Sequence, residues 1–243
     1  LIPARMGSSR FPGKPMAHIL NKPMIGHVYD NVKDNKYIND TFVATCDKEI
    51  FDYIVSIGGN SIMTKDTHVR ASDRCAEALI KIEKNKKTKY DIVIMVQGDE
   101  PMIHSNMISE AVMPLIQDSK IKVSNLLGKI TTLKELEDKN CIKVVYDKNF
   151  DALYFSREKI PTGSDIDKFS FGKQICIIPF KRDFLLDYTE LDPTPLEIIE
   201  SIDMLRVLEH GYKVRMIPTA YQTKAVDTVD DLKSVEKLLT EKK

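Results

Sequence analysis

The chain has 243 residues, of which 42% are hydrophobic, and its 36 Lys and Arg residues are balanced by 36 Asp and Glu residues, which gives a formal net charge of zero. A balanced charge argues against nucleic-acid binding driven by the global charge of the protein. No apolar run approaches the roughly 18 residues that a membrane span requires. The length and apolar content suit one α/β domain with a sizeable core, and we predict a single domain over 1–243.

The cysteines and the start of the chain indicate where the protein works. The four cysteines (Cys46, Cys75, Cys141 and Cys176) are scattered and form no C-x-x-C pair. This pattern is typical of free thiols in a reducing cytosol and argues against a zinc site. No signal peptide is evident, and the chain starts at Leu1 inside a predicted strand, so we expect a few residues before it. We therefore predict a cytoplasmic protein.

A loop rich in small and cationic residues follows the first predicted strand, which ends at Leu1-Ile2. It runs over 2–15 and carries Arg5, Arg10 and Lys14 among two glycines and three prolines. Glycine lets a ligand approach the backbone, and proline keeps the segment out of a helix. Arg and Lys side chains donate to phosphate oxygens. The loop therefore predicts a cradle for a polyphosphate, with a basic surface linker as the alternative.

The same loop does not fit two known phosphate-binding motifs. Five residues instead of four separate Gly7 from Gly13, and Pro15 stands where a Walker A loop has its Mg²⁺-binding hydroxyl. The G-x-G-x-x-G fingerprint of dinucleotide-binding folds is also absent. The polyphosphate hypothesis therefore needs a metal ligand from elsewhere in the chain.

Helical and extended patterns alternate over the first hundred residues. Helices are predicted over 24–34, over 47–57 with Asp47 as N-cap, and from Ser72 or Asp73 to about 89. The last of these has Cys75, Ala76, Leu79 and Ile80 as its inward residues. Strands are predicted at 41–45, 61–63 and 91–96. This alternation predicts an α/β fold with a mostly parallel, doubly wound sheet.

The most apolar strand, 91–96, suits a central position with both faces covered. In doubly wound sheets, ligands bind outside the carboxyl ends of the strands. Three predicted loops lie at such ends: the opening loop, 45–47 and 97–101. We therefore expect these three loops to form the binding site together.

In the second half of the chain, strands no longer alternate regularly with helices. Strands are predicted at 142–145, 151–155, 173–179 and 214–218, and a β-rich subregion at about 122–175. A long amphipathic helix is predicted over Pro195–His210, and Thr228 is expected to cap a C-terminal helix.

Two aspartates are candidate ligands of a hard cation. Asp99 follows the apolar strand after a single glycine, and Asp227 follows the apolar pair Ala225-Val226. Mg²⁺ prefers one or two carboxylates together with phosphate oxygens of the substrate. The alternatives are helix caps, for Asp99 near Ser105 and for Asp227 beside Thr228.

Three further polar groups have both a binding and a structural interpretation. The segment 68–74 could offer backbone amides and Arg74 to a nucleobase or phosphate, or be a solvated loop. Ser156-Arg157 could bind an anionic second substrate. Glu197 and Glu200, at i and i+3 of a predicted helix, suit sugar hydroxyls, but an exposed helix face is the commoner meaning of such a pair.

Seven separated motifs carry a family resemblance that runs from end to end of the chain. They lie at 2–15, 21–25, 97–101, 152–157, 195–201, 205–209 and 226–228. In this order they resemble the 3-deoxy-manno-octulosonate cytidylyltransferases, also called CMP-KDO synthetases. The resemblance implies a Rossmann-like nucleotidyltransferase fold and a homodimer in which the β-rich subregion 122–175 is the contact. It also implies Mg²⁺-dependent transfer of CMP from CTP to a 3-deoxy acid sugar, with release of pyrophosphate, for lipopolysaccharide or capsule synthesis.

The resemblance also assigns residues position by position. It places the nucleotide at Ala4, Arg5, Ser8, Arg10, Lys14, Ala71, Ser72, Arg74 and Gln97. It places the acid sugar at Gln97, Ser156, Arg157, Gln174, Glu197 and Glu200. It implies that Asp99 and Asp227 bind the metal and act in catalysis together with Lys14 and Arg10.

Two departures from the family pattern leave the acceptor open. The chain has Arg70-Ala71-Ser72-Asp73-Arg74 where the family usually has Ser-Gly-Thr-Glu-Arg, and Gln174 where the family has a histidine. The alternatives for the acceptor are KDO, 8-amino-KDO, another ulosonic or sialic-type acid, or another small acid. A non-catalytic CTP-binding homologue is the alternative outside the enzymes.

Overall fold

The computed structural model describes residues 1–7 and 10–241. Contacts within the chain group into two compact units. The first unit comprises Leu1–Tyr90, Met95–Ser109 and Thr223–Lys243, and the second comprises Asp91–Ile94 and Glu110–Gln222. Each unit has its own sheet, and the single domain over 1–243 stays a prediction.

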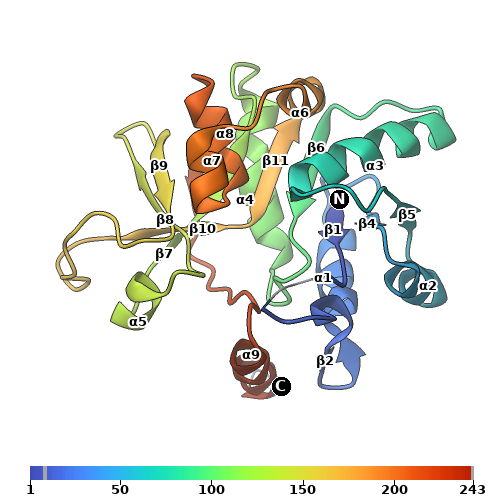
Figure 1. Ribbon diagram of the computed structural model, residues 1–243, viewed down its shortest axis with the longest axis horizontal. Coiled ribbons are helices and arrows are strands. Elements are labelled where there is room, and N and C mark those ends of the chain that lie inside the picture. The colour runs from blue at the N-terminus through green and yellow to red at the C-terminus, as the bar shows by residue number, and fades with distance from the viewer. Residues whose placement is uncertain (8–9, 242–243) are drawn as a thin grey trace. The chain divides into compact units, whose positions relative to one another are not determined.

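The first unit contains the parallel part of the predicted α/β fold. Strands β1 (Ile2–Ala4), β4 (Val43–Thr45) and β5 (Ser61–Met63) pair in the order β1-β4-β5, with Val43 opposite both Ile2 and Ser61. Helices α1 (Met24–Lys33), α2 (Lys48–Ser56) and α3 (Ala71–Lys86) alternate with these strands (Figure 1). The strand and helix order predicted for the first hundred residues is therefore confirmed.

Helix α3 packs along β1, β4 and β5 (Figure 1). Ala78 and Ile82 of the helix form a core cluster with Ala44 of β4. The prediction that Ile80 faces inward is wrong, because its side chain is 54% exposed. Successive helical residues are rotated by about 100°, so Ile80 turns away from the sheet when its neighbour Leu79 is buried.

Strand β6 (Ile92–Val96) ends beside the beginning of the chain, because the Val96 N–H donates to the Leu1 carbonyl at 3.0 Å. A short hairpin of β2 (His18–Ile19) and β3 (Lys22–Pro23) precedes α1. The C-terminal helix α9 (Val229–Glu241) packs on this hairpin through Val235 and Ile19. Both chain segments that carry the predicted metal ligands therefore belong to the first unit.

The second unit contains a five-stranded mixed sheet in the order β12-β7-β10-β8-β9. Its strands are β7 (Ser124–Lys129), β8 (Lys143–Tyr146), β9 (Ala152–Ser156), β10 (Gly172–Ile175) and β12 (Arg215–Pro218). β12 pairs with β7 in parallel, and the other pairs are antiparallel. Strand β7 was missed in the sequence, since its Ser, Asn and Gly residues break the apolar pattern.

Two long elements predicted in the second half are each divided. The strand predicted over 173–179 is β10 followed by β11 (Ile177–Lys181), and β11 pairs with β6 in a separate sheet. The helix predicted over Pro195–His210 is α7 (Pro195–Glu200) and α8 (Asp203–Glu209). The break falls at Ser201, whose φ of +54° lies in the left-handed region that ends helices. No glycine or proline marks this break in the sequence.

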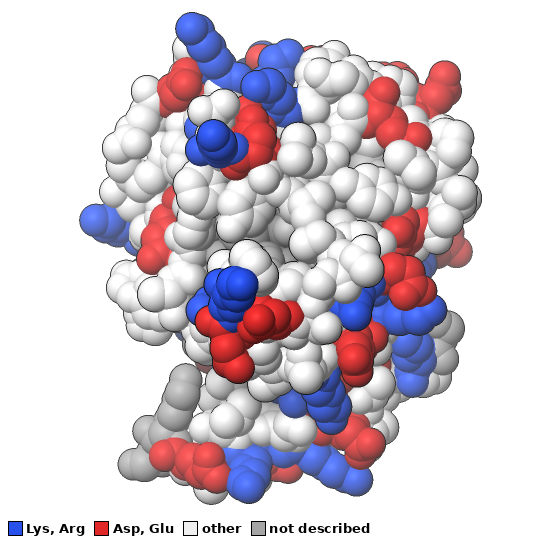
Figure 2. Space-filling model, turned by 90° about the vertical axis from the view of Figure 1, so that its left-hand side faces the viewer, with Lys and Arg blue, Asp and Glu red and all other residues white. Residues whose placement is uncertain are grey.

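The remaining helices of the described residues are α4 (Ser105–Gln117), α5 (Leu133–Glu137), α6 (Arg182–Thr189) and the short 3-10 helix η1 (Lys14–Met16). Over residues 1–7 and 10–241, no helix combines the length and the apolarity that crossing a bilayer takes. On the face drawn in Figure 2, basic and acidic side chains lie beside one another, in line with the zero net charge.

Candidate functional site

The opening loop of the first unit turns back on itself after β1. The Gly13 N–H donates to the Met6 carbonyl at 3.0 Å, and Gly13 has a φ of +74°, a conformation that glycine adopts without strain. Lys14 then begins η1, with Pro15 buried beneath it. Of the residues predicted to bind nucleotide here, Ala4 is buried and Arg5 and Arg10 are exposed. Ser8 lies outside the described residues.

The three loops predicted at the carboxyl ends of the strands are brought together in the first unit. The Met6 N–H donates to Asp47 Oδ2 at 2.8 Å, which joins the opening loop to the end of β4. Asp47 is the N-cap residue of α2, as predicted, but its side chain makes no hydrogen bond to the start of that helix. The loop after β6 also lies against β1, because a Cβ on Gly98 would come within 3.2 Å of the Pro3 carbonyl.

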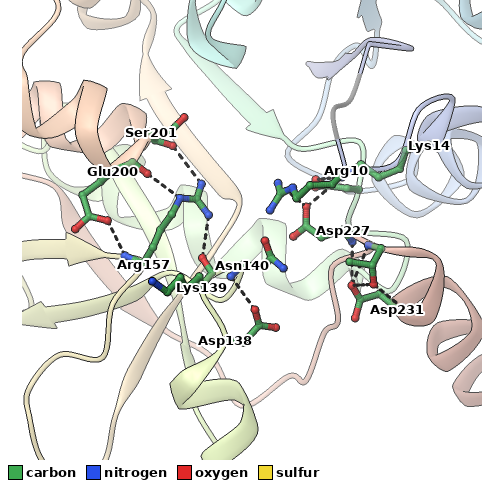
Figure 3. Close-up of polar contacts among 12 residues, drawn as sticks. Arg10, Lys14, Asp138, Lys139, Asn140, Arg157, Glu200, Ser201, Asp227 and Asp231 are labelled. Atoms are coloured by element: carbon green, nitrogen blue, oxygen red, sulfur yellow. Dashed lines mark hydrogen bonds and ion pairs between the residues drawn. The ribbon is translucent and has the colours of Figure 1, made fainter.

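Four charged side chains converge where the opening loop meets Asp99 and Asp227. Lys14 Nζ lies 2.8 Å from Asp99 Oδ2 and 3.4 Å from Asp227 Oδ1. Arg10 Nη2 lies 2.9 Å from the same Asp227 oxygen, and Figure 3 shows its side chain directed at Asp227. We call Arg10, Lys14, Asp99 and Asp227 the charge cluster. Its two acids and two bases come from three separate chain segments.

The charges of the cluster depend on one another. Burial raises the pKa of Asp227, and the nearby charge of Asp99 raises it further, against the opposing effect of Lys14 and Arg10. Burial lowers the pKa of Lys14, but the two carboxylates outweigh it and the net pKa is raised. Lys14 is therefore held as an ammonium that compensates two neighbouring carboxylates.

The capping alternatives for Asp99 and Asp227 are both wrong. Asp231 Oδ2 accepts from the Thr228 N–H at 3.0 Å and the Asp231 N–H donates to Thr228 Oγ1 at 3.2 Å, which is a reciprocal cap of α9. Helix α4 begins only at Ser105, whereas the Asp99 carboxylate contacts Lys14. The Val226 N–H donates to the Asp99 carbonyl at 2.9 Å, so the backbone holds the two aspartate segments together.

The donor set of the charge cluster fits a hard divalent cation. One ammonium contacts oxygens of both Asp99 and Asp227, so these oxygens already share a single cation. Two carboxylates are the number that Mg²⁺ takes when phosphate oxygens complete its shell. Over 1–7 and 10–241, no group of three or more His, Cys, Asp or Glu side chains could hold a metal ion, so a metal site here rests on this pair.

The segment predicted to meet the nucleobase is largely buried. Arg74 is 2% exposed and Ser72 is fully buried, so the solvated-loop alternative is wrong for both. Arg74 Nη1 donates to Thr64 Oγ1 and to the Lys65 carbonyl, and its buried Nη2 has no hydrogen-bond partner among the described residues. Arg74 therefore shapes the loop that follows β5, while Ala71 and Gln97 are half-buried at element ends.

In the second unit, Ser156, Arg157 and Glu200 form one hydrogen-bonded group. Glu200 Oε1 accepts from Ser156 Oγ at 2.7 Å, and Glu200 Oε2 accepts from the Arg157 N–H at 2.8 Å. The Arg157 guanidinium donates to the backbone carbonyls of Glu200 (2.7 Å), Lys139 (3.1 Å) and Ser201 (3.3 Å), as Figure 3 shows. The end of β9 is thus fixed to the end of α7.

Gln174 and Glu197 occupy different surroundings from this group. Gln174 Nε2 donates to Oδ1 of the buried Asn125 at 2.5 Å. Glu197 is fully buried and both of its oxygens accept from Arg206, each at 2.7 Å. The expectation of an exposed helix face is therefore wrong for Glu197, because the break at Ser201 folds α8 back so that Arg206 reaches α7.

Asn125, Lys143 and Arg206 are buried polar residues that the sequence interpretation missed. Lys143 and Arg206 each stand inside an apolar run, in Ile142-Lys143-Val144-Val145 and Leu205-Arg206-Val207-Leu208. A charged residue at an inward position of such a run indicates a buried, paired group, and this signal could have identified them.

Glu197→Gln is expected to destabilise the fold by about 3 kcal/mol, because it leaves the Arg206 guanidinium buried without its carboxylate. Urea unfolding monitored by circular dichroism measures the change, with Glu190→Gln on the exposed end of α6 as the control. A free energy of unfolding unchanged by Glu197→Gln would contradict the structural role assigned to this ion pair.

The chain is similar to known proteins over its whole length. The cytidylyltransferase family model matches residues 1–217. The 3-deoxy-manno-octulosonate cytidylyltransferase of Geobacter metallireducens is 40% identical over 98% of this chain and 96% of its own length. The protein of the same name from Thermodesulfovibrio yellowstonii is 41% identical over 98% of this chain and 96% of its own length.

A solved structure agrees with these relatives. The structure of CMP:2-keto-3-deoxy-manno-octonic acid synthetase complexed with CTP superposes with a TM-score of 0.88 at 34% identity, and the match covers 100% of this chain and 98% of the other. The predicted Rossmann-like nucleotidyltransferase fold is thereby confirmed.

Proposed function

The chain belongs to the cytidylyltransferase family, among the 3-deoxy-manno-octulosonate cytidylyltransferases, and from this premise we propose that it transfers CMP from CTP to the anomeric hydroxyl of KDO and releases pyrophosphate. The observation that carries the proposal is the charge cluster, in which two cations of the opening loop meet two carboxylates. Such a set suits a polyphosphate with its divalent cation.

The nucleotide is assigned to the first unit. Arg5, Ser8, Arg10 and Lys14 bind the triphosphate, and the phosphate oxygens replace the carboxylates as partners of Lys14 and Arg10. Asp99 and Asp227 are then available to hold Mg²⁺. When bound, Mg²⁺ supplies charge neutralisation at the phosphates and lowers the pKa of the attacking hydroxyl. Lys14 and Arg10 stabilise the departing pyrophosphate by charge, so the chain positions the substrates without forming a covalent intermediate.

The cytosine end of the nucleotide is assigned to Ala71, Ser72 and Arg74, with Gln97 at the ribose. The buried Arg74 supports this assignment by fixing the loop at 64–65 rather than by offering an exposed charge. Ala71 and Ser72, at the start of α3, supply backbone N–H groups that suit the carbonyl of a base.

The acid sugar is assigned to Ser156, Arg157, Gln174 and Glu200, together with Gln97. Arg157 supports this assignment because its side chain has five N–H donors and uses three of them on backbone carbonyls. The remaining two lie on the two terminal nitrogens and suit a carboxylate bound in the bidentate manner. Glu197 takes a supporting role, because it anchors the helix that carries Glu200.

Turnover of CTP with KDO in the presence of Mg²⁺ is the expected result, measured as release of pyrophosphate and formation of CMP-KDO. A panel of 8-amino-KDO, a sialic acid and a small hydroxy acid, each with CTP, compares acceptors under the same conditions. EDTA is expected to stop the reaction, and excess Mg²⁺ to restore it. CTP binding without turnover of any acid would instead identify a non-catalytic CTP-binding homologue.

The wider setting belongs to the same proposal. A CMP-activated acid sugar is a glycosyl donor, so the product would serve lipopolysaccharide or capsule synthesis. The homodimer with 122–175 as its contact and the cytoplasmic location also stay predictions.

A further inference from the structure

Lys143 of β8 is a lysine that none of the roles above uses. Its side chain is fully buried, and its ammonium donates to three backbone carbonyls: Asp138 at 2.7 Å, Cys141 at 2.7 Å and Arg157 at 2.6 Å. It forms no ion pair within the part of the chain that the structure describes. Three carbonyls satisfy all three N–H donors of an ammonium. Lys143 therefore joins the turn at 138–141 to the end of β9.

Arg157 joins the same two segments in the opposite direction. Its guanidinium donates to the Lys139 carbonyl at 3.1 Å, between the two turn carbonyls that Lys143 holds, while its own carbonyl accepts from Lys143. The Asn140 N–H donates to Asp138 Oδ1 at 2.8 Å, which closes the turn (Figure 3). Lys143 thus holds the turn that presents the Lys139 carbonyl, which is one of the three carbonyls that fix the Arg157 guanidinium.

We propose that Lys143 is a positioning residue for the acid sugar, which sets the plane of the Arg157 guanidinium by holding the 138–141 turn and the Arg157 carbonyl in place. This inference rests on the proposed function, in which Arg157 binds the sugar carboxylate. A bidentate pair needs the two free N–H groups of Arg157 to lie in the plane of that carboxylate. Without the Lys139 contact, the guanidinium keeps its bonds to the Glu200 and Ser201 carbonyls but can tilt about them, which weakens the bidentate geometry even though the charge remains.

A merely structural lysine would behave differently from a positioning residue. If Lys143 served only stability, its replacement would lower the amount of active enzyme and leave both KM values unchanged. If it positions Arg157, the KM for KDO rises while the KM for CTP does not, because the CTP-binding residues lie in the first unit. The split between the two KM values therefore distinguishes the two roles.

The test compares Lys143→Met with Lys173→Met in steady-state kinetics with CTP and KDO. Lys173 is a matched control, because it is also buried, lies opposite Lys143 in the β10–β8 register, and pairs with Glu135 instead of the turn. Lys143→Met is expected to raise the KM for KDO by about tenfold, the loss expected for one charge-assisted hydrogen bond. Lys173→Met is expected to leave it within about twofold.

A double variant tests whether Lys143 acts through Arg157. The double variant Lys143→Met/Arg157→Gln is expected to have the same KM for KDO as Arg157→Gln alone, because the guanidinium that Lys143 positions is already absent. If Lys143→Met does not fold, as judged by circular dichroism, Lys143→Gln replaces it under the same criteria. An unchanged KM for KDO, or additive effects in the double variant, would overturn the inference. Absence of KDO turnover by the wild-type protein would overturn the proposed function instead.

Discussion

Asp99→Asn is expected to lower kcat by about 10³-fold or more while CTP binding survives in part. The amide keeps the size of the side chain but removes a charge from the pair that Lys14 now bridges. A neutral amide oxygen is a weaker ligand for a hard divalent cation than a carboxylate is, so the metal is bound more weakly and the charge that builds up on the leaving pyrophosphate is less well neutralised. Arg10 and Lys14 still contact the triphosphate, which preserves part of the affinity for CTP.

The measurement is pyrophosphate release under saturating CTP and KDO, together with CTP binding by calorimetry. Asp230→Asn is the control, since Asp230 lies in the first turn of α9 near Asp227 but its side chain is 94% exposed. Raising the Mg²⁺ concentration is expected to recover part of the lost activity. Near-normal turnover of Asp99→Asn at low Mg²⁺ would remove Asp99 from the metal site.

Lys14→Met is expected to lower kcat by about 10² to 10³-fold and, in the absence of CTP, to strengthen the binding of a divalent cation. In the free protein, Lys14 compensates Asp99 and Asp227, and it is only 12% exposed. Without the ammonium, the two carboxylates repel each other, and a cation that binds between them relieves that repulsion. Catalysis still suffers, because the pyrophosphate loses a charge-assisted donor.

Mn²⁺ titration followed by electron paramagnetic resonance measures the metal affinity of the free protein, and steady-state kinetics measure kcat. Lys48→Met is the matched control, because Lys48 also pairs with an aspartate, Asp52, but lies on the exposed surface of α2. If Lys14→Met bound Mn²⁺ no more tightly than the wild type and kept its kcat, neither role of Lys14 in the charge cluster would stand.

Residues that act through local backbone features could be predicted from the sequence. The opening loop and Asp99 each follow an apolar strand, and in a parallel sheet the carboxyl ends of such strands meet at one edge. Asp227 follows only an apolar pair that is not part of a strand, so its spacing alone left its role open. The structure brings all three together around Lys14. The order of strands and helices in the first unit was predictable for the same reason, since hydrophobic periodicity is a local property.

Residues whose role depends on distant partners could not be placed in this way. Asp47 looks like a helix cap in sequence, but its carboxylate accepts from the Met6 N–H, which comes from another loop. The sequence places Glu197 on an exposed helix face, but in the structure α8 folds back and Arg206 donates to both Glu197 oxygens. Nothing within either residue's own helix specifies that partner, because a hydrogen bond across the fold depends on how separate elements pack.

The sequence by itself therefore determined the α/β class and marked the opening loop, Asp99 and Asp227 as candidates for one site, since these features depend on the order and spacing of neighbouring residues. Only the tertiary structure decided that Lys14 stands between both acids, that α7 and α8 are separate helices, and that Lys143 holds the turn beside Arg157. The physical reason is burial: a charged group removed from water must find its partners in three dimensions, and those partners lie on other elements of the fold.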